Sequence, residues 1–252
     1  MSDKNIHLSI VVPAYNEAAR IVQPLRCIDR YLRTQAIRAE VIVVDDGSTD
    51  GTAEVVRRLA RDLATPVWVV VCPENRGKGR AVAVGMVQAQ GRAVLMSDAD
   101  LSTPIEELEK LLPHLQNGAQ VVIGSRWLPG SRIEVRQPLL RQAMGVVFTF
   151  LTRLLVVGAS DVTCGFKLFT REAATQIFSR TTLDDWSFDA EALFLARRMG
   201  FGIVEVPVRW RDVAGTKVRR GRDAARAVLG LASIVLNTFC GQYDHAPVRG
   251  RR

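Results

Sequence analysis

The sequence predicts an α/β protein built on a mostly parallel sheet with helices on both faces. Short β-rich runs alternate with amphipathic stretches through the first half of the chain, which is the pattern of strand-helix-strand units. The β-rich runs are almost continuously apolar, as strands buried on both faces are. The length of 252 residues fits one large α/β domain or two small ones.

In the first half we expect four strands, at 8–12, 41–44, 67–71 and 93–96, and four helices, at 17–33, 51–63, 78–90 and 104–116. The residues between them support these boundaries. Asn16 is expected to cap the first helix, the polar loop 46–50 ends in a cap, and Pro104 suits the first turn of the fourth helix. Ligands of open α/β sheets bind beyond the carboxyl ends of the strands, so the loops there are the candidate site.

The second half is less regular. A strand is expected at 121–124, then an Arg-rich loop at 126–136 and a helix from 138 to about 157. After a loop at 161–167 we expect helices at 171–178 and 188–199, a strand at 203–210, and apolar residues at helical spacing beyond Arg222. With no linker-like stretch in the sequence, we expect a single unit, in which 1–222 carry the α/β fold and 223–252 an amphipathic helix and basic tail.

Composition excludes several classes of protein. With 48% hydrophobic and 24% charged residues, the chain is too apolar for a disordered protein. The four cysteines form no CxxC pair, which argues against a zinc site or a disulfide framework and favours a reducing, cytoplasmic setting. No apolar run reaches the roughly 20 residues that a membrane-spanning helix needs.

Positive charge is concentrated at the C-terminal end. The net charge is +8, and residues 209–252 hold ten Lys and Arg against three Asp. Such a segment suits phosphates, an anionic membrane or nucleic acid, or is simply a solvated tail. A non-enzymatic module binding membrane or nucleic acid is therefore one alternative. Nucleic acid is not expected as a partner, because aromatics make up only 6% of the chain, which is weak for single-strand recognition.

The strongest chemical motif is Asp98-Ala99-Asp100, directly after the apolar run 93–96. In an extended segment, residues i and i+2 project to the same side, so both carboxylates can face one site. Hard oxygen ligands suit Mg²⁺ or Mn²⁺ bridging a diphosphate. The sequence contains no GxxxxGK[ST], GxGxxG, GxSxG or HExxH motif, so other nucleotide sites, hydrolase triads and zinc proteases have no support.

Polar residues also follow the other predicted strands of the first half. Tyr15 and Glu17 follow the first, Asp45 and Asp46 end the second, and 75–79 follows the third. Each segment alone is an ordinary turn or helix cap. Because parallel strands end at one edge of the sheet, we expect these loops to line one crevice with Asp98 and Asp100.

These motifs resemble those of the family 2 glycosyltransferases, which have the GT-A fold, a Rossmann-like sheet. The stretches that match are 9–17, 43–52, 75–79 and 98–100. Within that family the sequence is most similar to dolichyl-phosphate β-glucosyltransferases and other polyprenyl-phosphate glycosyltransferases. The narrower likeness is carried by 98–104, 124–126, 164–169, 186–191 and 215–217.

The resemblance implies a nucleotide-sugar site and a divalent metal, Mg²⁺ or Mn²⁺. Asp100 would bind the metal with Asp98 near it. Ser102 stands where mannosyltransferase relatives often have a Gln that joins the metal. The residues implied for the nucleotide-sugar are Pro13, Tyr15, Glu17, Asp45, Asp46, Lys78 and Asp98.

A polyprenyl phosphate acceptor is already largely ionised near neutral pH, because its second pKa is about 6. It needs cations to hold it rather than a strong base. By resemblance these cations are Arg126, Lys167, Lys217 and Arg219, of which Arg126 and Lys217 are also expected to be catalytic. Asp189 and Glu191 fall where related enzymes place a catalytic acid for hydroxyl acceptors, and here they act as a base or orient cations or the sugar.

The function expected from this resemblance is inverting, metal-dependent transfer of a hexose, glucose from UDP-glucose, to dolichyl or polyprenyl phosphate. The alternatives within the fold are a GDP-mannose-dependent transferase and one with a soluble acceptor. A lipid acceptor requires a membrane surface, so we expect a cytoplasmic protein that associates peripherally. The amphipathic stretch 142–157 suits an interfacial helix, or equally a core or dimer helix.

Overall fold

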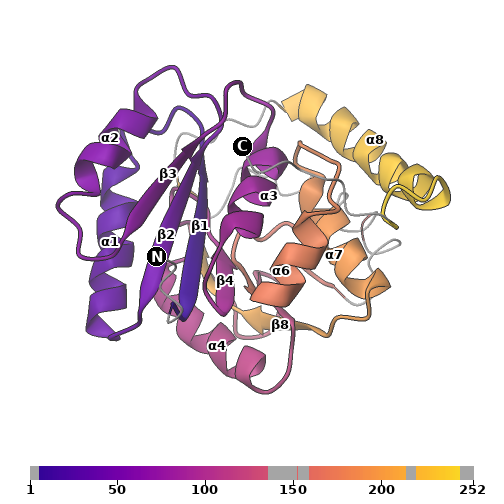
Figure 1. Ribbon diagram of the computed structural model, residues 1–252. Coiled ribbons are helices and arrows are strands. Elements are labelled where there is room, and N and C mark those ends of the chain that lie inside the picture. The colour runs from indigo at the N-terminus through magenta and orange to yellow at the C-terminus, as the bar shows by residue number, and fades with distance from the viewer. Residues whose placement is uncertain (1–5, 136–151, 153–158, 214–219, 245–252) are drawn as a thin grey trace.

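The computed structural model describes residues 6–135, 152, 159–213 and 220–244, and its centre is a seven-stranded sheet (Figure 1). The strand order is β3-β2-β1-β4-β7-β5-β8. All neighbouring pairs are parallel except those of β7, which runs antiparallel to β4 and β5. The strands are β1 (Leu8–Ala14), β2 (Ala39–Asp45), β3 (Val67–Val71), β4 (Ala93–Met96), β5 (Val121–Ser125), β7 (Lys167–Thr170) and β8 (Ile203–Pro207).

Helices cover both faces of the sheet because the central strands are apolar on both sides (Figure 1). Val11 of β1 belongs to the core on one face, which also includes residues of α3, α6, α7 and α8. Its neighbours Ile10 and Val12 belong to the core on the other face, with residues of α1, α2 and α4. The helices are α1 (Val22–Thr34), α2 (Thr52–Leu59), α3 (Lys78–Gln88), η1 (Ile105–Glu107), α4 (Leu108–Gln116), α6 (Arg171–Phe178), α7 (Phe188–Arg198) and α8 (Arg220–Phe239).

The first helix begins later than the sequence suggested. It starts at Val22 rather than at Glu17, and Asn16 does not cap it. Asn16 has a positive φ of 52°, its N–H donates to Ser48 Oγ, and its Oδ1 accepts the N–H of Thr49. The segment after β1 is therefore held to the loop after β2 instead of continuing directly into a helix.

Two short strands escaped the sequence analysis. β7 lies where a loop was expected to lead into a helix, and β6 (Arg132–Val135) lies within the expected Arg-rich loop. The strand expected at 203–210 is divided at Val208 into β8 and β9 (Arg209–Arg211), and β9 pairs with β6 in a separate two-stranded sheet. The helix expected at 138–157 lies outside the described residues except for Thr152.

The last helix, α8, packs on α7 through one side only. Leu231 and Ile234 are buried, whereas Leu229, Leu236 and Phe239 are exposed. Among the residues that the structure describes, no helix has both the length and the apolar character needed to cross a bilayer.

Candidate active site

Asp46, at the carboxyl end of β2, holds the loop between β3 and α3 in place. Its carboxylate accepts the backbone N–H groups of Arg76 and Gly77 at 3.1 and 2.8 Å and the Asn75 side-chain amide at 2.8 Å. Burial raises the pKa of Asp46, although these bonds oppose the rise. A Cβ at Gly47 would stand 2.6 Å from Asn75 N, so the two loops pack backbone to backbone as well.

The loop after β1 lies against the loop after β2 at the same edge of the sheet. The N–H of Glu17 donates to Thr52 Oγ1 at 2.8 Å, and its carboxylate forms an ion pair with Arg20. The Glu17 carboxylate raises the pKa of Arg20, and Asp100 adds to the effect from the neighbouring loop. Tyr15 exposes its ring to solvent, whereas Pro13 and Asp45 are buried.

The loop after β4 carries both acids of the Asp98-Ala99-Asp100 motif. Asp98 Oδ1 accepts Lys78 Nζ at 2.5 Å, and the ammonium lies 5.3 Å from the centre of the exposed Trp186 ring. Burial lowers the pKa of Lys78, but the Asp98 and Asp189 carboxylates outweigh it and the net pKa is raised. Asp100 Oδ1 accepts both the N–H and the hydroxyl of Ser102.

This acidic pair has the chemistry of a divalent-cation site. Burial and the negative charge of Asp98 raise the pKa of Asp100, and a cation between or beside the two carboxylates would relieve that repulsion. The described part of the chain contains no cluster of three or more His, Cys, Asp or Glu that suits a metal. Two carboxylates are enough for Mg²⁺ or Mn²⁺ when substrate phosphates and water supply the remaining ligands.

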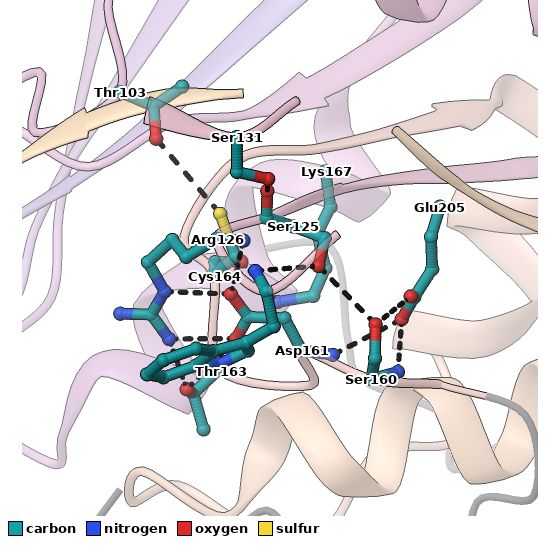
Figure 2. Close-up of polar contacts among 11 residues, drawn as sticks. Thr103, Ser125, Arg126, Ser131, Ser160, Asp161, Thr163, Cys164, Lys167 and Glu205 are labelled. Atoms are coloured by element: carbon teal, nitrogen blue, oxygen red, sulfur yellow. Dashed lines mark hydrogen bonds and ion pairs between the residues drawn. The ribbon is translucent and has the colours of Figure 1, made fainter. Parts of the chain in front are cut away.

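Arg126, just beyond β5, is held by a buried carboxylate (Figure 2). Asp161 Oδ2 accepts the Arg126 backbone N–H at 2.9 Å and Nε–H at 2.7 Å, and Oδ1 accepts Nη2 at 2.7 Å. Nη2 also donates to Thr163 Oγ1 at 2.7 Å, and the guanidinium lies 5.4 Å from the Trp210 ring centre. Burial lowers the pKa of Arg126, but Asp161 reverses this, with Asp98 contributing, so the net pKa is raised.

The backbone on the N-terminal side of Asp161 is fixed by Glu205 of β8 (Figure 2). The Glu205 carboxylate accepts both the N–H and the hydroxyl of Ser160, and the N–H of Asp161 at 3.2 Å. Sequence analysis missed Asp161, Thr163 and Glu205, because a lone acid in an irregular loop carries no spacing that points to a partner 35 residues away. The only clue in the sequence was Arg126, the residue to which Asp161 bonds in the structure.

Lys167 and Asp189 form an ion pair that is shut away from solvent. Lys167 Nζ donates to the Asp189 carboxylate and, at 2.6 Å, to the carbonyl of Cys164. Burial raises the pKa of Asp189 despite the opposing charges of Lys167 and Lys78. Lys167 and Asp189 are therefore buried in the interior near Lys78, and neither side chain faces solvent.

Glu191 is also buried, and four donors surround its carboxylate. Thr182 offers its N–H and hydroxyl, Leu183 its N–H, and Tyr243 its hydroxyl at 2.8 Å. Burial raises the pKa of Glu191. Among the expected residues, the structure pairs Lys78 with Asp98 and Lys167 with Asp189, whereas Glu191 binds a different set of groups. Lys217 and Arg219 lie outside the described residues.

Comparison with known proteins decides the family. Residues 9–178 match the model of glycosyl transferase family 2. The chain belongs to this family. It is 38% identical over 230 residues to dolichyl-phosphate β-glucosyltransferase ALG5C of Trichomonas vaginalis, covering 86% of this chain and 68% of that protein. Identity to the Homo sapiens dolichyl-phosphate β-glucosyltransferase is also 38%, over 84% of this chain and 69% of that protein. These matches confirm the predicted family and enzyme class, a glycosyltransferase.

Two solved structures of glycosyltransferases share the fold. Glucosyl-3-phosphoglycerate synthase from Mycobacterium tuberculosis, in complex with Mn²⁺, UDP-glucose and glycerol 3-phosphate, is similar with a TM-score of 0.69 and 20% identity, covering 91% of this chain and 80% of that one. Mannosyl-3-phosphoglycerate synthase from Rubrobacter xylanophilus gives a TM-score of 0.66 at 18% identity, over 97% of this chain and 77% of that one. The expected GT-A fold is confirmed.

Proposed function

We propose that this family 2 glycosyltransferase transfers glucose from UDP-glucose to the phosphate of a dolichyl or other polyprenyl phosphate, with inversion at the anomeric carbon. The observation that carries the proposal is a site with two distinct sides. Asp98, Asp100 and Lys78 form a side suited to a metal and a diphosphate. A fixed guanidinium, Arg126, is held by Asp161, which begins the segment 161–167 whose Gly165 lies against Asp98.

On the donor side, Asp98 and Asp100 would hold Mg²⁺ or Mn²⁺, and Lys78 adds a cation next to them. When bound, the metal supplies charge stabilisation for the departing nucleoside diphosphate. Asp46 acts on the donor site by fixing the 75–77 loop, and Tyr15 offers an exposed ring directly after β1. Mn²⁺ and UDP-glucose in the mycobacterial synthase, which shares the fold, support this assignment.

On the acceptor side, the reaction needs a held phosphate rather than a strong base, because the second pKa of a phosphate monoester is about 6. Arg126 provides a fork of N–H donors whose geometry matches phosphate oxygens. The names of relatives that are 38% identical over most of the chain support a dolichyl phosphate as the acceptor. Lys217 and Arg219 are further acceptor-side cations in this proposal.

A lipid acceptor also requires contact with a membrane, and we include peripheral association on the cytoplasmic side in the proposal. Its support is the apolar face of α8, where Leu229, Leu236 and Phe239 are exposed, together with the basic residues of 209–252. Insertion of the apolar side chains into the headgroup region and attraction of the basic residues to anionic lipids would both strengthen membrane binding.

The test is a transfer assay with purified enzyme, citronellyl phosphate as a short prenyl phosphate, and UDP-glucose, UDP-galactose and GDP-mannose as donors. We expect a new glycolipid from UDP-glucose, dependent on Mg²⁺ or Mn²⁺ and abolished by EDTA. Glycolipid from GDP-mannose alone would reassign the donor. Transfer to 3-phosphoglycerate but not to the prenyl phosphate would reassign the acceptor to a soluble phosphate.

A further inference from the structure

The hydrogen bonds of Arg126 divide its guanidinium into a held edge and an open edge. A guanidinium has five N–H donors in a rigid fork. Nε–H and both hydrogens of Nη2 are used by the Asp161 carboxylate and Thr163 Oγ1. Nη1 donates to no other residue in the described part of the chain, so its two hydrogens remain for a ligand.

Asp161 makes most of its hydrogen bonds with Arg126, and its Oδ1 also accepts the Thr163 hydroxyl at 3.4 Å. Its side chain has 0% exposure, and its two oxygens accept three N–H groups of Arg126. The charge of Arg126 lowers the pKa of Asp161 well enough to overcome the effect of burial, so the carboxylate is ionised when it holds the guanidinium. The Trp210 ring lies beside the guanidinium and limits its movement in that direction.

We propose that Asp161 is the positioning residue of the acceptor phosphate site: it fixes Arg126 so that Nη1 faces the phosphate, and it offsets part of the arginine charge. The inference rests on the proposed function. This partial neutralisation of charge matters because a phosphate oxygen is the nucleophile. A guanidinium without a carboxylate partner would withdraw electron density from that oxygen and lower its nucleophilicity. Asp161 does not touch the acceptor itself.

The experiment compares wild-type enzyme with D161N, varying citronellyl phosphate and UDP-glucose in turn. The asparagine amide keeps the size of Asp161 but presents N–H groups to a guanidinium that needs acceptors, so Arg126 loses its fixed direction. We expect the acceptor KM to rise about ten- to hundred-fold, the range of a lost charge-assisted hydrogen bond, while the UDP-glucose KM changes less than about twofold.

A double-mutant cycle separates positioning from general damage. If Asp161 acts through Arg126, D161N has no further effect on the acceptor KM in an R126M background. The R126M/D161N protein contains neither buried charge and is expected to fold even if R126M alone is weakened by its unpaired Asp161. An equal cost of D161N in both backgrounds, or an equal rise of both KM values, overturns the inference.

Glu40 provides a matched control at the opposite end of the sheet. Its carboxylate is buried at the start of β2 and accepts Ser9 Oγ at 2.7 Å and Gln90 N at 2.9 Å. We expect E40Q to lower the melting temperature without the acceptor-specific change in KM. A rise in acceptor KM for E40Q as large as that for D161N would attribute the effect to lost stability and overturn the assignment.

Failure of the inference and failure of the proposed function give different results. Turnover by the wild type with an unchanged acceptor KM in D161N overturns the inference alone. If the wild type binds citronellyl phosphate in calorimetry but transfers no sugar to it, the proposed function is wrong, and the loss of that binding in D161N then tests the inference directly. A wild type that neither binds nor glucosylates the phosphate overturns both.

Discussion

Gly165 lies directly against the carboxylate of Asp98, so that a Cβ at position 165 would stand 1.9 Å from Asp98 Oδ2. The two residues belong to different sides of the site. Asp98 follows β4 and accepts Lys78, whereas Gly165 belongs to the segment 161–167, whose first residue holds Arg126. This contact joins the side that suits the metal and diphosphate to the side that suits the acceptor phosphate.

G165A should therefore impair turnover while leaving the fold intact. The added methyl group forces the Asp98 carboxylate to rotate, which breaks its 2.5 Å contact with Lys78. We expect kcat to fall about 100-fold, since a displacement of about 1 Å at a reacting site has that effect. Overpacking should also cost about 1–3 kcal/mol of unfolding free energy. Steady-state kinetics and thermal denaturation measure the two effects.

G202A is the control for this variant. Gly202 lies just before β8, and its added Cβ would stand 3.2 Å from the flexible Gln120 side chain, at Oε1. We expect G202A to keep kcat within about twofold, as surface substitutions usually do little. Full activity in G165A would mean that Asp98 tolerates a different rotamer and that the contact is not needed for catalysis.

D100N should lose metal-dependent turnover without losing stability. Burial and Asp98 raise the pKa of Asp100, so its ionised form destabilises the metal-free fold, and this cost develops as the pH rises from the ordinary Asp value of about 3.9 toward the raised pKa. The asparagine removes the charge but can still accept the Ser102 bonds. We expect kcat to fall at least about 100-fold, in keeping with several kcal/mol of lost charge stabilisation.

The matching measurement is the melting temperature with and without Mn²⁺. In EDTA, D100N should melt no lower than the wild type, and Mn²⁺ with UDP should stabilise the wild type only. D62N, a change at an exposed acid beyond α2, is the control for loss of one negative charge. Normal Mn²⁺-dependent turnover in D100N would place the metal elsewhere.

K167M should destabilise the protein through the partner that it leaves behind. Lys167 and Asp189 are both buried, and removing one member of such a pair costs about 3–5 kcal/mol. The deficit should shrink as the pH falls toward about 3.9, because protonation then relieves the unpaired Asp189 carboxylate. Urea unfolding at several pH values measures this. The double variant K167M/D189L should recover most of the stability, and no recovery would show that the pair is not coupled.

Much of the fold was predictable because its signal is local. The strands β1, β2, β4 and β5 are apolar runs that polar loops terminate, and burial on both faces leaves little ambiguity about them. β7 was not predictable in this way. It has four residues and begins with Lys167, whose charge is stabilised by Asp189 from α7 and by the Cys164 carbonyl. A strand that depends on such a distant partner has no pattern of its own.

The residues of the candidate site likewise differ in how far the sequence could predict them. Asp46, Asp98 and Asp100 were predictable from their places at strand ends, because parallel strands bring those ends to one edge. Asp161 was not, since its role depends on a guanidinium that the fold brings to it from beyond β5. Glu191 looks the same in sequence as a catalytic acid, and only the four donors around it indicate a different use.

E191Q distinguishes a catalytic base from an internal support. As a base, Glu191 would produce the acidic limb of the pH profile of kcat, and E191Q would abolish that limb. As a support, it holds residues 182 and 183, next to the segment that places Trp186 over Lys78, and anchors Tyr243 beyond α8. We expect a lower melting temperature with an unchanged pH profile. Y243F, which removes one donor to Glu191, should reproduce part of that loss, about 1 kcal/mol. An E191Q enzyme that melts normally but has lost its acidic limb would instead make Glu191 the base.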